Sequence, residues 1–330
     1  MKFRKVAVLT MIGAMAMSMT AFADSDLSKL SGDISCTGSS ALQPLVQAAA
    51  DKFADVAPGV NITVDAGGSG QGLQNVSDGT STVGDSDVFA EEKLDKDKAA
   101  ELVDHQVCAI GMAVVVSQDV ADGGVKSLTT DQLVSIFTGE TTNWKDVGGP
   151  DEDITLVLRP EGSGTRATFD KYALGGAEEA GEAMENDNSA ELQKALQDTN
   201  GSVGYLALSY ILPDEAKDAM KGIATVAIND VEPTLENIYS GKYDVWAYEH
   251  MYTKGDADEA TQAFIDYITG DFSDDVESLG YCVSSKLTKT DGHTGLRIQP
   301  RRQKQQPKHS KFQHRPDPED GNRKSQAETV

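Results

Sequence analysis

The chain has 330 residues, with 29 Lys and Arg against 53 Asp and Glu, and its formal net charge at pH 7 is −24. Residues 24–288 carry 16 of these basic and 48 of these acidic residues, which gives a net charge of −32. Nucleic acids and anionic membranes are therefore poor partners for this part of the chain, because like charges repel. Any anion that binds there must be held by local donors against the field of the whole protein.

Residues 1–23 have the pattern of a secretory signal peptide. Three basic residues at positions 2–5 precede an apolar run, which ends in Ala21-Phe22-Ala23 and fits the A-x-A cleavage rule. A short transmembrane anchor is the alternative, but the run is rich in Ala and Met rather than Leu. No cysteine stands at the cleavage site, so a lipid anchor is not expected there. We expect an exported protein, located in the periplasm, at the cell surface or outside the cell.

Residues 289–330 differ in character from the rest of the chain. They contain ten Lys or Arg, five Asp or Glu and three of the five histidines, with no apolar periodicity. Such a segment cannot bury enough apolar surface to fold alone, which favours a basic, disordered tail. Binding of nucleic acid or of an anionic surface is the alternative, and we assign this tail no function.

The part between these ends is about 265 residues long, enough for two lobes with their own cores. It contains the three cysteines, Cys36, Cys108 and Cys282, each in or beside an apolar run and without metal-like spacing. We expect buried free thiols, although an exported protein could close one disulfide.

Strand-like and helix-like patterns alternate along this part of the chain. Strands are predicted at 33–38, 60–68, 81–89, 107–117, 153–160, 202–208, 223–230 and 245–253. Helices are predicted at 42–53, 129–139, 189–201 and 258–270, the second with a Thr cap. This alternation favours an α/β architecture. No internal repeat or Pro/Ser linker is present, so strands that cross between the two lobes are expected to join them.

Three junctions between a strand and a helix share one design: "TGSSAL" (37–42), "GGSGQGL" (67–73) and "EGSGTR" (161–166). The first N–H groups of a helix have no internal partner, and the helix dipole is positive there. Glycine allows close approach of the backbone, and Ser or Thr adds hydroxyl donors, so such junctions are suited to anions. One junction alone is more often an ordinary cap or turn; three together favour an anion site.

Two charged residues belong to the same pattern. Arg159 ends a strand just before the third junction, where a guanidinium could hold an oxyanion through two hydrogen bonds. Asp87 closes the strand at 81–89 and is a second candidate for the site. Alternatively, Asp87 is an ordinary helix cap or part of a surface turn.

Enzymatic and cofactor motifs are not found. The sequence has no G-x-x-x-x-G-K-[ST], no G-x-G-x-x-G and no G-x-S-x-G. His105 and His250 could act as general bases, but neither follows a nucleophile motif. We therefore expect no catalytic residue, metal or cofactor.

Taken together, several segments resemble the phosphate-binding protein of bacterial phosphate ABC transporters. The resemblance runs from about residue 33 to 285, and its most specific segment is "IFTGETTNWKDVGGPDEDITLVLRPEGSGTRATF". It implies a type II periplasmic-binding-protein fold with two α/β lobes around a two-strand hinge. Lobe 1 would contain residues 24–114 and 225–288, and lobe 2 residues 115–224.

The resemblance also implies a ligand and its binding residues. Inorganic phosphate would be bound and delivered to a membrane permease and its ATPase, by a monomer that is not an enzyme. Asp87 would accept the proton that phosphate keeps near neutral pH, which sulfate lacks, so that sulfate is rejected. The phosphate-binding residues implied are Ser40, Ala41, Ser69, Asp87, Arg159, Ser163, Gly164 and Thr165.

The chain departs from the family pattern at several positions. Asp85 adds a carboxylate two residues before Asp87, on the same face of the strand, and could weaken anion binding. Ala41 is smaller than expected, and the sequence diverges from Thr288 onward. The alternatives are a receptor for another oxyanion, a secreted phosphate-ester hydrolase, and a surface protein that senses phosphate without transporting it.

Overall fold

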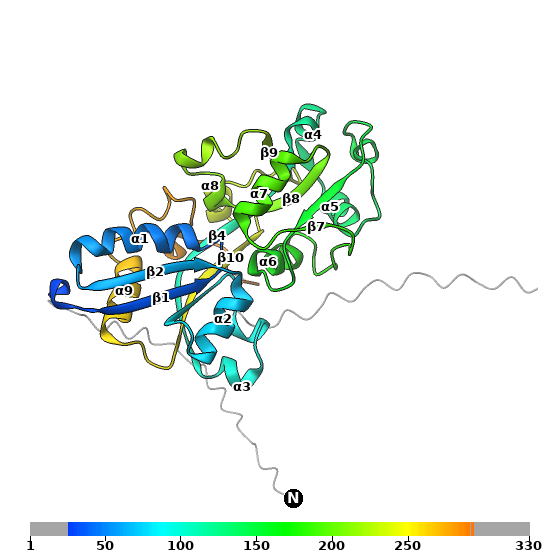
Figure 1. Cartoon of the computed structure of the whole chain (residues 1–330). Coiled ribbons are helices and arrows are strands. Elements are labelled where there is room, and N and C mark those ends of the chain that lie inside the picture. The colour runs from blue at the N-terminus through cyan, green and yellow to red at the C-terminus, as the bar shows by residue number, and fades with distance from the viewer. Residues whose placement is uncertain (1–25, 291, 294–330) are drawn as a thin grey trace, which may run out of the picture. The chain divides into compact units, whose positions relative to one another are not determined.

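A computed structural model describes residues 26–290, 292 and 293. The predicted signal peptide and most of the predicted tail lie outside these residues. The described chain forms one compact α/β unit around a ten-stranded sheet (Figure 1), with the strand order β2-β1-β3-β10-β4-β8-β6-β7 and with β9 and β5 joined to β4 off this path.

The first part of the sheet is mainly parallel. β1 (Gly32–Gly38) pairs with β2 (Val60–Ala66) and β3 (Val83–Ser86) in parallel, and β10 (Trp246–Lys254) runs antiparallel to β3. We call these four strands and their helices the β1–β3 side. The carboxyl ends of β1, β2 and β3 consequently lie at one edge of the sheet.

One long strand connects this side to the rest of the protein. β4 (Leu102–Ser117) pairs along its first part with β10 and along its second part with β8 (Ser202–Ala207) and β9 (Ile223–Ile228). β6 (Thr155–Leu158), β7 (Met184–Glu185) and β5 (Ser127–Leu128) complete the sheet. We call β5 to β9 and their helices the β6–β8 side.

Helices cover both faces of each side. On the β1–β3 side, α1 (Gln43–Val56) and α9 (Glu259–Thr269) pack together through Phe53 and Phe264, while α2 (Ser69–Asp78) belongs to a separate apolar cluster with Tyr252. On the β6–β8 side, α7 (Ser189–Asp198) belongs to one apolar cluster, and α5 (Thr130–Phe137) and α6 (Gly164–Tyr172) belong to another. Short helices occupy Lys96–Ala99 (α3), Gln118–Asp122 (α4) and Leu235–Tyr239 (α8).

The predicted strands and helices are confirmed, because their local signals agree with their burial. Thr129 caps α5 and forms a capping box with Gln132. The apolar residues of α1 recur at helical spacing and are buried on one face. The short elements β5, β7, α3, α4 and α8 were not predicted, since each is too short to show a periodicity.

The two predicted lobe boundaries fall inside strands. Residues 114 and 115 lie in β4 and residues 224 and 225 lie in β9, which pairs with β4 and β5. The division into lobes remains a prediction. Cys36, Cys108 and Cys282 are free and buried, as expected.

The start of the predicted tail contacts the body. Lys289 Nζ lies 2.6 Å from Asp244 Oδ2, and the buried His293 ring stacks between Trp246 and Tyr172.

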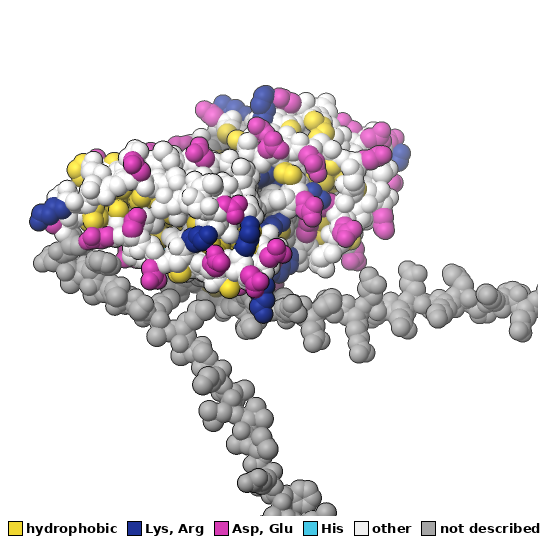
Figure 2. Space-filling view, turned by 60° about the horizontal axis from the view of Figure 1, so that its bottom comes forward, with side chains coloured by type: hydrophobic (Ala, Val, Ile, Leu, Met, Phe, Trp, Pro, Cys, Tyr) yellow, Lys and Arg dark blue, Asp and Glu magenta, His cyan; other side chains and the backbone are white. Residues whose placement is uncertain are grey.

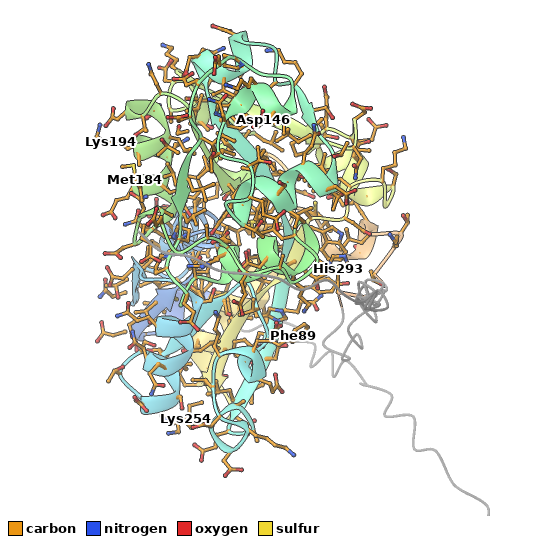
Figure 3. All side chains as sticks on the ribbon, turned by 90° about the vertical axis from the view of Figure 1, so that its right-hand side faces the viewer. Phe89, Asp146, Met184, Lys194, Lys254 and His293 are labelled. Atoms are coloured by element: carbon orange, nitrogen blue, oxygen red, sulfur yellow. The ribbon has the colours of Figure 1, made fainter. Side chains whose placement is uncertain are left out.

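Lys254 and Asp146 lie toward opposite ends of the molecule, with His293 between them (Figure 3).

Acidic side chains are scattered over the face in Figure 2, without a single large patch. Among the described residues, no helix is long and apolar enough to cross a membrane.

Candidate anion-binding site

Four helix N-termini meet where the two sides of the protein face each other. β1 leads into α1, β2 into α2 and β6 into α6, and the segment after β7 leads into α7. β1 and β2 end at one edge of their part of the sheet, whereas β6 and β7 run in the opposite direction, so the two sets of carboxyl ends and the turns after them face each other. The eight predicted binding residues are all buried, and the contacts described below join them into one site.

Asp87 stands just beyond the end of β3 and receives hydrogen bonds from both sides. Ser39 Oγ donates to its Oδ1, Thr165 Oγ1 donates to its Oδ2 at 2.8 Å, and Ser69 Oγ accepts from its backbone N–H at 3.1 Å. Burial raises the pKa of Asp87, whereas Ser39, Thr165, Glu249 and Arg159 oppose that rise. These donors make Asp87 the best-stabilised carboxylate in the site.

Arg159 is 1% exposed and is held by four hydrogen bonds that it donates. Its Nε and Nη2 donate to the carbonyls of Asn186 and Asp187, at 3.1 and 2.8 Å. Its Nη1 donates to the hydroxyls of Ser40 and Ser189, at 3.1 and 3.2 Å. Burial lowers the pKa of Arg159, but a guanidinium stays charged in proteins. The two serine hydroxyls therefore sit beside a fixed positive charge, and because their oxygens bond to each other at 2.9 Å, one of the two hydroxyl hydrogens is still available.

The third junction packs tightly against the second. The backbone N–H of Gly70 donates to the carbonyl of Gly162 at 3.0 Å, across the two sides. A Cβ added at Gly164 would lie 2.1 Å from Ser69 Oγ and 3.1 Å from Asp87 Cβ. Gly164 is thus required by close approach of α6 to α2 and to Asp87.

The remaining predicted residues shape the backbone around this centre. The backbone N–H of Ala41 donates to Ser39 Oγ at 3.0 Å, and its carbonyl accepts from Tyr281 Oη at 2.5 Å. Ser163 is the N-cap of α6 and accepts from the N–H of Arg166 at 3.2 Å. The first turns of α1 and α6 are thereby fixed with their N-terminal dipoles directed at the site.

Two site residues were missed in the sequence. Ser39 lies in the first junction next to the predicted Ser40; in the structure Ser39 donates to Asp87, whereas Ser40 accepts from Arg159. Ser189 follows the Asn188 cap of α7, and its Oγ lies 2.9 Å from Ser40 Oγ. A serine at the start of a predicted helix was a usable signal for a fourth junction.

Asp85 and Glu249 add two buried carboxyl groups behind Asp87. Asp85 is 1% exposed and Glu249 is 0% exposed, on β3 and β10 respectively. Asp85 Oδ1 and both carboxyl oxygens of Glu249 have no hydrogen-bond partner among the described residues. Burial, with Asp87 close by, raises the pKa of both groups well above the ordinary range. Burial thus favours the protonated form of both groups.

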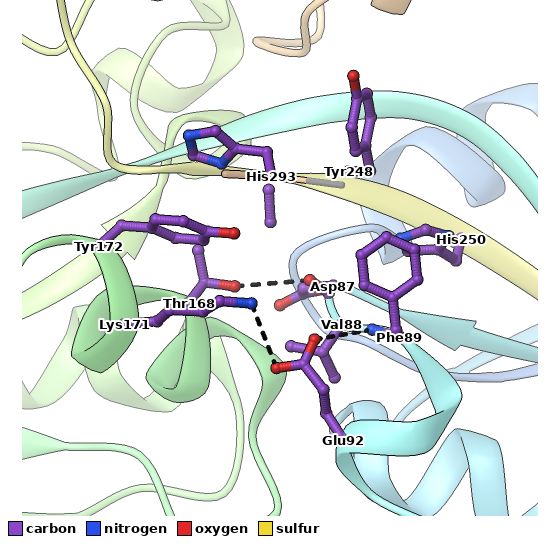
Figure 4. A pocket seen from close by; sticks show the side chains of 11 residues that line it. Asp87, Val88, Phe89, Glu92, Thr168, Lys171, Tyr172, Tyr248, His250 and His293 are labelled. Atoms are coloured by element: carbon purple, nitrogen blue, oxygen red, sulfur yellow. Dashed lines mark hydrogen bonds and ion pairs between the residues drawn. The ribbon is translucent and has the colours of Figure 1, made fainter. Parts of the chain in front are cut away.

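A small hollow adjoins Asp87 (Figure 4). Phe89 and His250 line it from the β1–β3 side and Tyr172 from the β6–β8 side, next to His293. His250 turns its Nδ1 to Asp104 at 2.8 Å and not to Asp87.

His105 is likewise bonded away from the site, with its Nε2 3.0 Å from Thr253 Oγ1. Within residues 26–290, 292 and 293, no group of three His, Cys, Asp or Glu could hold a metal ion. The geometry suits a small oxyanion, with one guanidinium, hydroxyl donors, helix N-termini and a carboxylate that can accept a proton.

The fold and the site define an anion-binding protein with the type II periplasmic-binding fold. The PBP superfamily domain matches residues 25–271. The phosphate-binding protein PstS of Bacillus subtilis is 50% identical over 240 residues, which cover 73% of this chain and 76% of that protein. The chain therefore belongs to the PBP superfamily and, within it, to the family of PstS.

Solved structures agree with this assignment. A putative phosphate ABC transporter substrate-binding protein with bound phosphate, from Clostridium perfringens, is 28% identical with a TM-score of 0.68. The match covers 76% of this chain and 99% of that one. An ABC-type phosphate transport receptor from Vibrio cholerae has the same fold, with a TM-score of 0.59, 24% identity and coverage of 76% and 99% of the two chains.

The burial of Asp85 predicts a pH-dependent stability. Because its pKa is raised in the folded protein, ionisation favours the unfolded chain as the pH rises above about 4, the ordinary pKa of Asp. Until the folded-state pKa is reached, each pH unit costs about 1.4 kcal/mol of unfolding free energy. Asp85→Asn should remove this loss, so the unfolding free energy of the variant, measured by urea unfolding, should rise relative to that of the wild type as the pH increases above about 4.

Asp55→Asn, on an exposed position of α1, is the matched control for the loss of one carboxylate. A constant difference in unfolding free energy between wild type and Asp85→Asn across this pH range would contradict the prediction.

Proposed function

We propose that this protein binds inorganic phosphate outside the cytoplasm and delivers it to the permease and ATPase of an ABC-type phosphate importer. The observation that carries the proposal is the pairing of a buried carboxylate, Asp87, with a buried guanidinium, Arg159, among four helix N-termini. The name of the B. subtilis relative and the phosphate bound in the C. perfringens structure point to the same ligand.

Phosphate is the oxyanion that suits an ionised carboxylate. A fully ionised anion would face Asp87 with two unpaired negative charges in a medium of low polarity. Phosphate near neutral pH keeps a proton, which it can donate to Asp87, while its other oxygens accept from Arg159 and the helix N-termini. Sulfate has no such proton, so Asp87 would select against it.

The contacts support specific roles for the predicted residues. Arg159 supplies the charge, the Thr165 hydroxyl is a donor that bonds to Asp87, and the Ser40 hydroxyl accepts from Arg159 and can donate to the ligand. Ser69, Ser163, Gly164 and the backbone of Ala41 position the helix N-termini. We further propose that the protein acts as an exported monomer, without enzymatic activity.

Calorimetric titration of the purified protein, freed of bound ligand, tests the function directly. We expect one phosphate per chain with a Kd of about 1 μM or tighter. Arg159→Ala should weaken binding at least about 100-fold, because the site loses its positive charge and the donors that the guanidinium holds in place. The phosphate affinity of Arg159→Lys, which keeps the charge without the planar fork, should lie between those of the wild type and Arg159→Ala. Unchanged affinity in Arg159→Ala would exclude Arg159 from the site.

Asp87→Asn should reduce the discrimination between phosphate and sulfate. The amide is neutral and can donate a hydrogen bond, so a fully ionised oxyanion no longer meets a negative charge. The ratio of the two dissociation constants should fall by about tenfold or more, measured by titration at neutral pH. If sulfate is still rejected to the same extent, Asp87 is not the selective group.

Two glycines of one loop form a matched pair for testing closure. The Cβ of Gly164→Ala would meet Ser69 Oγ at 2.1 Å, so the start of α6 must move away from α2 and phosphate binding should weaken at least about tenfold. Gly162→Ala meets nothing within 4 Å and should bind phosphate like the wild type. Equal affinities of the two variants would contradict the close approach of these helices in the phosphate complex.

A further inference from the structure

Glu249 is a fully buried acid for which the proposed function provides no role. Its side chain is 0% exposed, and neither carboxyl oxygen receives a hydrogen bond within the described part of the chain. An ionised carboxylate in such a place lacks both water and donors, which makes the protonated form the stable one. A protonated carboxyl is also a hydrogen-bond donor, and it requires an acceptor.

The sheet register supplies that acceptor. β10 pairs with β3 so that His250 lies opposite Ser86 and Met251 opposite Asp85. Side chains alternate along strands, so Glu249 lies on the same face of the sheet as Asp85 and Asp87. Continuing this antiparallel register by one residue sets Glu249 opposite Asp87, so the two carboxyl groups are neighbours.

The charged and titratable groups around Glu249 determine which acid holds a proton. They come from β3 and the turn after it (Asp85, Asp87), from β4 (Cys108) and from the segment after α9 (Tyr281). None of these is a cation, and Arg159 acts on Asp87 instead. Asp87 also has the donors Ser39 and Thr165, which Glu249 lacks. The negative charge therefore belongs on Asp87 and the proton on Glu249.

We propose that Glu249 is a neutral carboxyl that donates a hydrogen bond to Asp87 and so holds Asp87 ionised, as the acceptor of the ligand's P–OH group. Glu249 is a positioning residue that sets oxyanion selectivity without touching the ligand. The inference rests on the proposed function. Without this donor, Asp87 takes up a proton more readily, becomes a donor itself and no longer rejects a fully ionised oxyanion.

The test compares Glu249→Met, which has similar length and no donor, with Glu249→Gln, whose amide can still donate to Asp87. Phosphate and sulfate are titrated into each purified variant at about pH 7 and about pH 5, where sulfate stays fully ionised. In Glu249→Met the ratio of sulfate to phosphate Kd should fall about tenfold or more at about pH 5, and less at about pH 7. Glu249→Gln should restore the wild-type ratio at both.

Met251→Leu, the next residue of β10 on the same face, controls for disturbance of the buried strand. It should keep the wild-type selectivity. If Glu249→Met folds and still rejects sulfate as the wild type does at both pH values, the proposal is wrong.

A proton count provides a second measurement that needs only Glu249→Gln. Phosphate binding is measured in two buffers of different ionisation enthalpy, which gives the protons taken up per phosphate bound. If Glu249 keeps its proton throughout, the wild type and Glu249→Gln take up the same number. A wild type that takes up about one proton more shows that Glu249 is ionised before phosphate binds, which overturns the proposal. This comparison decides the matter if Glu249→Met does not fold.

Failure of the inference and failure of the proposed function give different results. A wild type that does not bind phosphate refutes the function. A wild type that binds phosphate and rejects sulfate, with a Glu249→Met variant that does the same, refutes only the role of Glu249.

Discussion

The carboxylate of Asp87 is the constraint on which the arrangement of this protein depends. A buried carboxylate must receive hydrogen bonds, and those on Asp87 come from Ser39, before α1, and from Thr165, in the first turn of α6. The first hydroxyl belongs to the β1–β3 side and the second to the β6–β8 side. Satisfying one negative charge therefore draws the β1–β3 side and the β6–β8 side together, and it brings the N-termini of α1, α2 and α6 to the same point.

The acidity of residues 24–288 does not prevent anion binding at this point. Charges on the surface act through water and salt, which screen them beyond about 8–10 Å. Inside the site, Arg159 and the helix N-termini act at hydrogen-bonding distance in a less polar medium, where the same charge has a much larger effect. The local donors consequently outweigh the field of a net charge of −32.

Local signals explain what the sequence could predict. The Thr129 cap, the apolar spacing of α1 and the glycine junctions each lie within one short segment, and so do Arg159 and Asp87. Ser189 and Glu249 depend instead on which segments pair in three dimensions. Glu249 acquires its place beside Asp87 from the register of β10 against β3, about 160 residues apart in the chain, and no periodicity within "VWAYEHMYT" encodes that pairing.

The pairing of β10 with β3 also changes how Asp85 is interpreted. Read from the sequence, a second carboxylate near Asp87 implies more negative charge in an anion site. In the structure Arg159 acts on Asp87, and among the described residues Asp87 receives hydrogen bonds that Asp85 Oδ1 and both Glu249 oxygens lack, so a negative charge on either of the other two would be unpaired and buried. In the protonated form, which burial favours, Asp85 and Glu249 add no charge to the site. The centre of the site is close to neutral, with Asp87 balancing Arg159, and the helix N-termini remain to attract an anion.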